Sequence, residues 1–484
     1  MRTTISLENG VAGDVNRRFN TPINFNLKED EHIAVIGLNG SGKSTLIQTV
    51  TGQLFLREGK LSFDFGPTAH RYNSENIRYV TFNDAYGTAT ADYYYQQRWN
   101  SQDCELSPCV EKILSREKCG QSSWKEHVYS ILGIDTMRNK QIVSLSSGEL
   151  RKLHIAKLLL SEPKVIILES PFIGLDAPSR SQLAELLRQL TDTGVQIILV
   201  VSAPQDIPAF ITHVYEVADM QCGPKYTLQE YLSLETMTAR RLNVYDSSII
   251  LPTSADNDAN RCSAKEIVNF KKVSIRYGER TIIDNLDWKI LNGEKWALSG
   301  SNGSGKSTLL SLICADNPQA YTQNITLFDH KRGTGESIWD IKRHIGYVSP
   351  EMHRAYLKDI PAAAIVASGY YDTIGLYRQL TTTQMEECRA WLQVFGIDHL
   401  RDRSFVKLSS GEQRLLLLAR TMVKDPALLI LDEPLHGLDT INKERVRAII
   451  SAFAERPGKT IIYVTHYPEE LPRCIDKTLI LRRH

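Results

Sequence analysis

Apolar runs of strand length recur along this chain, separated by polar and glycine-rich stretches. Two of them, residues 33–36 and 296–298, each lead into a glycine-rich loop that a helix-forming segment follows. Two more apolar runs, residues 165–168 and 428–431, form a second matching pair further along the chain. A strand, a glycine-rich loop and a helix in that order are typical of a phosphate-binding unit. The pattern therefore predicts that such a unit occurs twice.

The length of the apolar runs bears on where the protein resides. The longest runs, such as residues 195–201, are far shorter than the roughly 20 residues that a helix needs to span a bilayer. Residues 1–11 lack the apolar core of a secretory signal. We therefore expect a cytoplasmic protein, either free or peripheral at the inner face of the membrane.

Size and charge favour a folded protein of two domains. The 484 residues are too many for one hydrophobic core and suggest two domains of roughly 200 to 240 residues. Hydrophobic residues make up 42% and charged residues 23%, as in ordinary globular proteins. With 57 basic and 56 acidic residues the net charge is +1, so the whole chain projects no strong field toward nucleic acid or anionic lipid.

Both glycine-rich loops, GLNGSGKST and GSNGSGKST, match the motif GxxxxGK followed by Ser or Thr. Glycine lets the backbone wrap closely around phosphates, whose charge the aligned N–H groups and the helix N-terminus meet. Lys43 and Lys306 would reach the β- and γ-phosphates of ATP, while Ser44 and Ser307 would place a hydroxyl on Mg²⁺. The loop residues expected to bind ATP are Gly37, Asn39, Gly40, Ser41, Gly42, Lys43, Ser44, Thr45, Gly300, Asn302, Gly303, Ser304, Gly305, Lys306, Ser307 and Thr308.

A second motif, LSSGE, follows each loop at residues 145–149 and 408–412. An ordinary serine N-cap with an acidic residue in the first helical turn would read the same way. The motif also resembles LSGGQ, the signature of ATP-binding cassettes (ABC), and its presence in both halves favours that family. The resemblance assigns nucleotide contacts to Ser146, Ser147, Gly148, Ser409, Ser410 and Gly411.

The spacing of the motifs indicates that the two halves are copies. Lys43 precedes Ser146 by 103 positions, and Lys306 precedes Ser409 by the same 103. One offset of 263 positions therefore relates loops and signatures. That offset permits a residue-by-residue comparison of the halves.

The family resemblance implies an α/β fold with two P-loop NTPase cassettes in tandem. Each cassette would carry a helical subdomain between its phosphate loop and its signature. We expect the first cassette at residues 1–232, a linker at 233–264 whose centre is polar and turn-rich, and the second cassette at 265–484. Cassettes of this family pair head to tail, so each nucleotide would lie between the loop of one half and the signature of the other, here within one chain.

Apart from one glutamine discussed below, the second half resembles the family at all its catalytic positions, and residues 431–434, LDEP, resemble the motif that ends in the catalytic carboxylate. Asp432 would hold Mg²⁺ and Glu433 would act as general base on the attacking water. At family spacing, His466 matches the residue that contacts the γ-phosphate, and Tyr277 matches the aromatic that stacks on adenine. Each residue also has a plain alternative: a surface carboxylate, a polar residue at a strand end, or a packing aromatic.

The offset of 263 predicts that the first half is degenerate. It aligns Asp432 with Glu169, and it places Ser170, Ala203 and Asp14 where the second half has its base, its histidine and its aromatic. Glu169 still offers an oxygen to Mg²⁺, so nucleotide can bind. Loss of a general base costs about 10² to 10⁴ in rate. We therefore expect hydrolysis mainly at the site anchored by the second half.

A departure from the family pattern concerns the transmembrane partner. The glutamine expected after the Tyr-Val strand is Phe82 in the first half and Pro350 in the second. In the family this glutamine touches Mg²⁺ and moves with the transmembrane subunits. The departure weighs against coupling to separate permease subunits.

Residues 335–349 and 368–377 resemble bacterial ModF-type tandem cassettes, whose name refers to molybdenum transport. The resemblance implies an ATPase that drives or switches a partner, such as a molybdate permease. A soluble regulatory ABC protein is the alternative. A ribosome or nucleic-acid factor is a third class, against which the near-neutral charge and the short linker weigh. Residues 93–99, YYYQQRW, would suit base stacking in that case, or else a packed helix of the helical subdomain.

Overall fold

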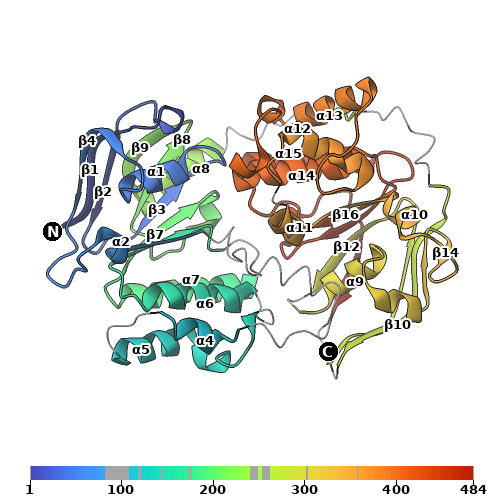
Figure 1. Ribbon diagram of the computed structural model, residues 1–484, viewed down its shortest axis with the longest axis horizontal. Coiled ribbons are helices and arrows are strands. Elements are labelled where there is room, and N and C mark those ends of the chain that lie inside the picture. Colours follow the sequence, from blue (N-terminus) through green and yellow to red (C-terminus); the bar gives the residue numbers. More distant parts are fainter. Residues whose placement is uncertain are drawn as a thin grey trace. The chain divides into compact units, whose positions relative to one another are not determined.

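The computed structural model describes residues 2–81, 108–117, 122–142, 145, 147–172, 175, 177–239, 249–252, 262–278, 280–300, 303–356 and 358–482. These residues form two compact units (Figure 1). The first contains the described residues up to 239 together with Gly437–Ile441, and the second contains the rest. Residues 93–99 and Phe82 lie outside the described part of the chain.

Buried parallel strands form the centre of the first unit. The strand order of its larger sheet is β5-β6-β7-β3-β8-β9, in which only the β8–β9 pair is antiparallel. Its smaller sheet is antiparallel, in the order β2-β1-β4. The strands are β1 (Thr3–Ala12), β2 (Ile23–Lys28), β3 (Ile33–Ile36), β4 (Leu56–Phe63), β5 (Ile77–Thr81), β6 (Val165–Glu169), β7 (Gln196–Val201), β8 (His213–Ala218) and β9 (Gln221–Thr227). β3, β6 and β7 are apolar at successive positions because a parallel sheet is covered on both faces.

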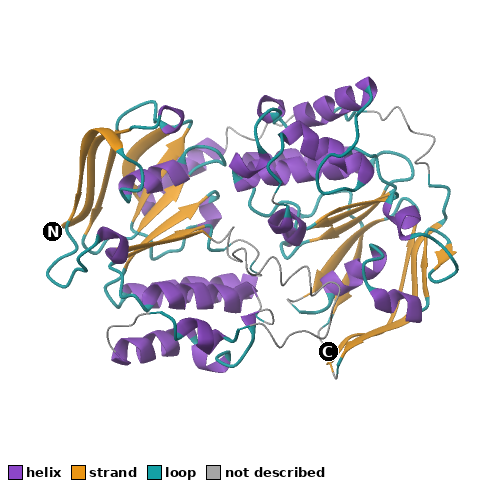
Figure 2. Cartoon of the chain, in the orientation of Figure 1, coloured by secondary structure: helices purple, strands orange, loops and turns teal. Residues whose placement is uncertain are grey.

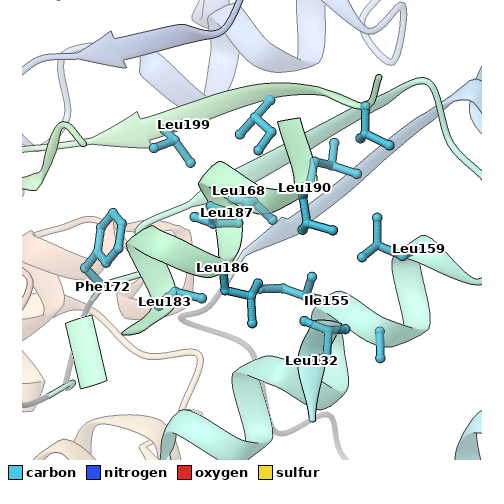
Figure 3. Close-up of a cluster of buried hydrophobic side chains, with 14 of the residues drawn as sticks. Leu132, Ile155, Leu159, Leu168, Phe172, Leu183, Leu186, Leu187, Leu190 and Leu199 are labelled. Carbon is cyan, nitrogen blue, oxygen red and sulfur yellow. The ribbon is translucent and has the colours of Figure 1, made fainter. Parts of the chain in front are cut away.

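The helices of the first unit are α1 (Lys43–Val50), α2 (Asn73–Asn76), α4 (Val110–Leu114), α5 (Ser122–Leu132), α6 (Ser147–Leu159), α7 (Ala177–Thr191) and α8 (Leu228–Ala239). Helix α7 packs its apolar face against the larger sheet, and α4 and α5 contact α6. Leu183, Leu186, Leu187 and Leu190 recur at helical spacing along α7 and meet Leu168 of β6 in one buried cluster (Figure 3). Burying each such leucine contributes about 1.5–3 kcal/mol.

The second unit repeats the same plan. Its parallel sheet has the strand order β15-β16-β17-β12-β18, and its antiparallel sheet has the order β11-β10-β13-β14. The strands are β10 (Glu266–Tyr277), β11 (Arg280–Leu291), β12 (Lys295–Gly300), β13 (Ile325–Leu327), β14 (His330–Lys331), β15 (Ile345–Val348), β16 (Leu428–Asp432), β17 (Thr460–Val464) and β18 (Lys477–Leu481). The helices are α9 (Lys306–Ile313), α10 (Ile338–Lys342), α11 (Pro350–Ala355), α12 (Ala362–Ala367), α13 (Thr382–Val394), α14 (Ser410–Met422) and α15 (Thr440–Ala454).

Helices gather between the loop and the signature of each half, as the family resemblance implied (Figure 2). They are α4 and α5 in the first half and α12 and α13 in the second. At the end of the first half, α8 extends past residue 233, where the linker was expected to begin. No helix of the described residues combines the length and the apolar character that a membrane span requires.

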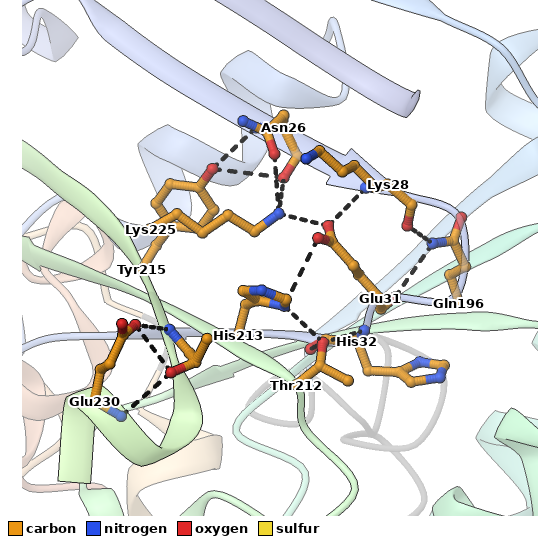
Figure 4. Close-up of polar contacts among 11 residues, drawn as sticks. Asn26, Lys28, Glu31, His32, Gln196, Thr212, His213, Tyr215, Lys225 and Glu230 are labelled. Atoms are coloured by element: carbon orange, nitrogen blue, oxygen red, sulfur yellow. Dashed lines mark hydrogen bonds and ion pairs between the residues drawn. The ribbon is translucent and has the colours of Figure 1, made fainter. Parts of the chain in front are cut away.

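A partly buried polar network around Glu31 fixes the turn that leads into β3, the strand before the first phosphate loop (Figure 4). The Glu31 carboxylate accepts a hydrogen bond from the backbone N–H of Lys28 at 2.7 Å and pairs with the ammonium of Lys225. His213 Nδ1 lies 3.7 Å from the other carboxylate oxygen. Lys225 also donates to Asn26 Oδ1 at 2.9 Å. The network thereby ties β2, β8 and β9 to the start of β3.

Two opposing effects act on the pKa of the Glu31 carboxyl group. Burial raises this pKa, whereas the hydrogen bonds from Lys225 and Lys28 and the positive charges of Lys225 and His213 lower it. The net result is a pKa below the ordinary value of 4.5. A carboxylate whose folded pKa is depressed stabilises the fold above its unfolded pKa, and that contribution disappears as pH falls through the folded value.

Glu31→Gln should lower the free energy of unfolding of the first unit at pH 7 by about 1–3 kcal/mol, because the buried Lys225 loses its counter-charge. The deficit should narrow as the pH falls below 4.5, where Glu31 becomes protonated in the unfolded wild-type chain, and it should disappear below the lower pKa of the folded carboxyl group. Thermal unfolding followed by circular dichroism between pH 3.5 and 7.5 measures both effects. Glu29→Gln is the matched control, because Glu29 pairs with Arg2 near the surface with 47% of its side chain exposed. Equal, pH-independent losses in the two variants would contradict this role for Glu31.

Candidate functional site

Each phosphate loop connects a central parallel strand to a helix, β3 to α1 and β12 to α9. Gly42 and Gly305 cap these helices with φ angles of +109° and +94°, in the left-handed region that favours glycine. A Cβ atom at Gly42 would also lie 2.7 Å from the Met220 sulfur. Both positions therefore require the glycine that the motif supplies.

The loop lysines fold back over their own loops. Lys43 Nζ donates to the carbonyl oxygens of Gly37 and Leu38, each at 2.8 Å. Lys306 Nζ donates to the carbonyl oxygen of Gly300 at 2.7 Å. Each ammonium thus lies against the loop that is expected to hold the phosphates.

In the first half, the hydroxyl and the carboxylate predicted to hold Mg²⁺ are in direct contact. Ser44 Oγ donates to Glu169 Oε1 at 2.8 Å, and the Tyr79 hydroxyl bonds the other oxygen of Glu169. Burial lowers the pKa of Lys43 to about 8, although the negative charges of Glu169 and Asp439 raise it. A hydroxyl and a carboxylate are the hard oxygen ligands that Mg²⁺ prefers, so this pair fits the ion.

The corresponding pair in the second half consists of Ser307, which is exposed at the start of α9, and Asp432, which is 8% exposed at the end of β16. This donor set also fits Mg²⁺. Ser307 and Asp432 would hold the ion, which would supply positive charge against the negative charge of the phosphates.

The first phosphate loop also contacts the segment Gly437–Ile441, which belongs to the first compact unit. The backbone N–H of Asn39 donates to Asp439 Oδ2 at 2.9 Å, and its side-chain amide donates to the Gly437 carbonyl at 2.8 Å. Ser202 Oγ donates to Asn39 Oδ1 at 3.2 Å. Asn39 is therefore held from both sides.

Two histidines flank the carboxylate of Glu433 in the second half. His466 Nε2 lies 3.3 Å from Glu433 Oε1, and His436 Nδ1 lies 3.9 Å from Glu433 Oε2. The side chain of Glu433 is 20% exposed and that of His466 is 8% exposed. The structure thus brings the predicted general base, Glu433, and the predicted histidine, His466, into contact, with the carboxylate partly exposed.

The backbone at the base position is the same in both halves. Glu433 and Ser170 both adopt left-handed conformations, with φ of +47° and +54°. The Glu433 N–H donates to the Val464 carbonyl at 2.9 Å, and the Ser170 N–H donates to the Val200 carbonyl at 2.8 Å. The first half therefore has the same backbone conformation at this position, with a serine in place of the carboxylate.

The strand register corrects one sequence prediction. Asp432 pairs with Val464, whereas Glu169 pairs with Val200, so the strand after the base is offset by 264 positions and not 263. The chain between α15 and β17 is one residue longer than the chain between α7 and β7. The first-half counterpart of His466 is consequently Ser202, and assigning Ala203 was wrong.

The two halves also differ where the adenine aromatic was predicted. Tyr277 is 41% exposed, and its hydroxyl accepts a hydrogen bond from Asn317 Nδ2 at 3.0 Å. The ring is therefore anchored at its edge while a large part of it remains open. At the equivalent first-half position, Asp14 lies 3.6 Å from Arg17 Nε, and Arg17 donates to Gln48.

In the second signature, Ser409 acts as the serine N-cap that the sequence also allowed. Ser409 caps α14 in a capping box, and its backbone N–H donates to the Glu412 carboxylate at 2.7 Å. Ser410 and Gly411 open the first turn of α14. In the first half, α6 begins at Ser147. Ser146 and Asn302 lie outside the described residues.

Sequence reasoning missed three residues that contact the site. Tyr79 and His436 touch the carboxylates of Glu169 and Glu433, and Arg414 bonds the backbone of the catalytic loop. Arg151 stands 263 positions before Arg414, so the two halves have the same residue at this position. This identity was the sequence signal that could have indicated Arg414. Pro350, at the position of the expected glutamine, begins the short helix α11 with Ser349 as its cap.

Comparisons with known proteins agree with this architecture. The family model described as ABC transporter matches residues 21–173 and 283–436. The ABC transporter ATP-binding protein ModF of Escherichia coli (strain K12) is 34% identical over 451 residues, covering 92% of this chain and 90% of that protein. An uncharacterized ABC transporter ATP-binding protein of Schizosaccharomyces pombe is 29% identical over 467 residues, covering 94% and 93%.

Solved structures share the fold over nearly the whole chain. A model of ribosome-bound archaeal Pelota and ABCE1 has a TM-score of 0.61 at 18% identity, covering 94% of this chain and 74% of that one. A complex of archaeal ribosomal stalk protein aP1 with ribosome recycling factor aABCE1 has a TM-score of 0.55 at 18% identity, covering 98% and 87%. These likenesses concern the fold alone. The family match and the similarity to the ModF protein establish that the chain belongs to the ABC transporter family and is an ATPase with two ATP-binding cassettes in tandem, which use ATP and Mg²⁺.

Proposed function

We propose that this ATPase hydrolyses ATP chiefly at the site anchored by its second half and holds nucleotide with little turnover at the site anchored by its first half. The observation that carries the proposal is the 3.3 Å contact between Glu433 and His466. The same backbone geometry in the first half presents only Ser170 and Ser202.

The residues of the competent site divide the chemistry among them. Glu433 accepts the proton of the attacking water as the oxygen–phosphorus bond forms, and ADP departs with the electron pair of the broken bond. His466 orients the carboxylate and donates toward the γ-phosphate. Lys306 neutralises charge on the β- and γ-phosphates. Serine at both first-half positions provides no proton acceptor of comparable basicity.

Each site combines the loop of one cassette with the signature of the other. We assign the cassettes to residues 1–232 and 265–484, joined by 233–264. The competent site then includes Ser146, Ser147 and Gly148, and the static site includes Ser409, Ser410 and Gly411.

The ATP cycle drives or switches a partner. The similarity to a protein named ModF supports a metal-oxyanion permease, such as one for molybdate, at the inner face of the membrane. The helix α11 that begins at Pro350 favours a second candidate, a soluble regulatory protein uncoupled from a permease, because no glutamine is available to follow transmembrane subunits.

Steady-state ATPase rates in the presence of molybdate permease subunits in lipid nanodiscs distinguish the two candidates. Stimulated turnover supports the permease partner. Slow turnover that is indifferent to the permease supports the regulatory protein.

Glu433→Gln should lower kcat by about 10² to 10⁴ while ATP still binds, because glutamine keeps the size of the base but accepts no proton. Ser170→Ala, at the matched position of the first half, should leave kcat within about twofold of wild type. A coupled ATPase assay and a fluorescent-nucleotide titration measure turnover and binding. Comparable losses of kcat in the two variants would exclude a single hydrolytic site.

Tyr277→Ala should weaken ATP binding at the competent site by roughly tenfold, because stacking of a base on an aromatic ring contributes about 1–3 kcal/mol. Tyr277→Phe keeps the ring and loses only the hydrogen bond with Asn317, so its KM for ATP should remain close to wild type. The KM of each variant gives the comparison. If alanine and phenylalanine raised KM equally, the hydroxyl and not the ring would be the binding element.

A further inference from the structure

Arg414 lies one turn into the signature helix α14 and is among the largest fully buried side chains of the described residues, with 1% of it exposed. Its guanidinium donates to four carbonyl oxygens. The bonds reach Asp432 at 2.9 Å, Glu433 at 2.5 Å, Pro434 at 3.3 Å and Ser349 at 3.0 Å. One side chain therefore joins the signature helix to two separate loops.

The first of these loops carries the general base. Three of the four carbonyls belong to consecutive residues, with Glu433 in the middle. The second contact, Ser349, lies between β15 and α11, beside the position where the family has its glutamine. The planar guanidinium offers several N–H donors in a fixed fork, so it can hold these carbonyls in one relative orientation.

The backbone of Glu433 needs such support. Its φ of +47° lies in the left-handed region, which costs a non-glycine residue of order 1–3 kcal/mol unless the surroundings determine it. The carbonyl of Glu433 also accepts the backbone N–H of His436 at 3.1 Å, and its own N–H is bonded to Val464. The orientation of this peptide sets the direction in which the carboxylate leaves the chain.

We propose that Arg414 is a positioning residue for ATP hydrolysis. By bonding the carbonyls around Glu433 it orients the carboxylate toward the attacking water and fixes that orientation relative to the signature helix. This inference rests on the proposed role of Glu433 as general base. The bonds of Arg414 described above are all to backbone carbonyl oxygens. Its action on the reaction is through the backbone of the base.

The chain contains its own control at the repeat position. Arg151 occupies the same place in α6, is 7% exposed, and belongs to the half whose base position is Ser170. Replacing either arginine disturbs a buried cation in a signature helix. Only replacement of Arg414 disturbs the backbone of a catalytic carboxylate.

Arg414→Lys and Arg151→Lys, in the full-length protein, test the inference. A lysine keeps the charge but cannot span four carbonyls with the geometry of a guanidinium. We expect Arg414→Lys to lower kcat by about tenfold to a hundredfold, because displacing a catalytic group by about 1 Å can lower the rate 10²-fold. The KM for ATP and the melting temperature should remain close to those of the wild-type protein. Arg151→Lys should leave kcat within about twofold. Arg414→Gln, with fewer donors, should give a larger loss of kcat than lysine.

Three outcomes would overturn the inference. Equal losses of kcat that follow equal losses of melting temperature would mean a purely structural arginine. A loss confined to Arg151→Lys would mean that the arginines act by placing the signature. Wild-type kcat in Arg414→Lys and Arg414→Gln would mean that the backbone bonds are dispensable. The Glu433→Gln variant separates the failure of the proposed base from the failure of the positioning role. If Glu433→Gln remains active, Glu433 is not the general base. If Glu433→Gln is inactive while the Arg414 variants have wild-type kcat, only the positioning role of Arg414 fails.

Discussion

The catalytic site depends on the parallel pairing of β16 with β17. This pairing sets Asp432 opposite Val464. The N–H of Glu433 donates to the carbonyl of Val464, and His466 follows Val464 by two residues. Because side chains alternate between the faces of a strand, a slip of one residue would turn these groups away from one another. The first half has the equivalent pairing of Glu169 with Val200. The two halves therefore share the strand pairing and differ in the side chains that follow it.

The paired strands hold Glu433, the proposed base, in a backbone conformation that is unfavourable for a residue other than glycine. A left-handed Glu433 is tolerated because its N–H, its carbonyl and the neighbouring carbonyls all have partners, among them the buried guanidinium of Arg414. Ser170 has a similar φ of +54° although its side chain is a hydroxyl and not a carboxylate. The strained turn is thus inherited with the fold, and the carboxylate is the part that makes it functional.

Features that depend on local backbone chemistry could be predicted from the sequence. The phosphate loops require glycine at Gly42 and Gly305, and their repetition revealed the two cassettes. The register of β7 could not be read from one constant offset, because a one-residue difference in the preceding loop moved the counterpart of His466 from Ala203 to Ser202. Contacts between elements, such as those of Arg414, depend on packing that motif spacing does not express.

The central claim is that one of two nucleotide sites hydrolyses ATP. The most direct measurement is the identity of the nucleotides bound during turnover, obtained by rapid removal of free nucleotide, acid quenching and separation of ATP from ADP. The account predicts that intact ATP remains bound beside ADP, and that Lys43→Ala removes the retained ATP while leaving the ADP. ADP alone at both sites of the wild-type protein would contradict it.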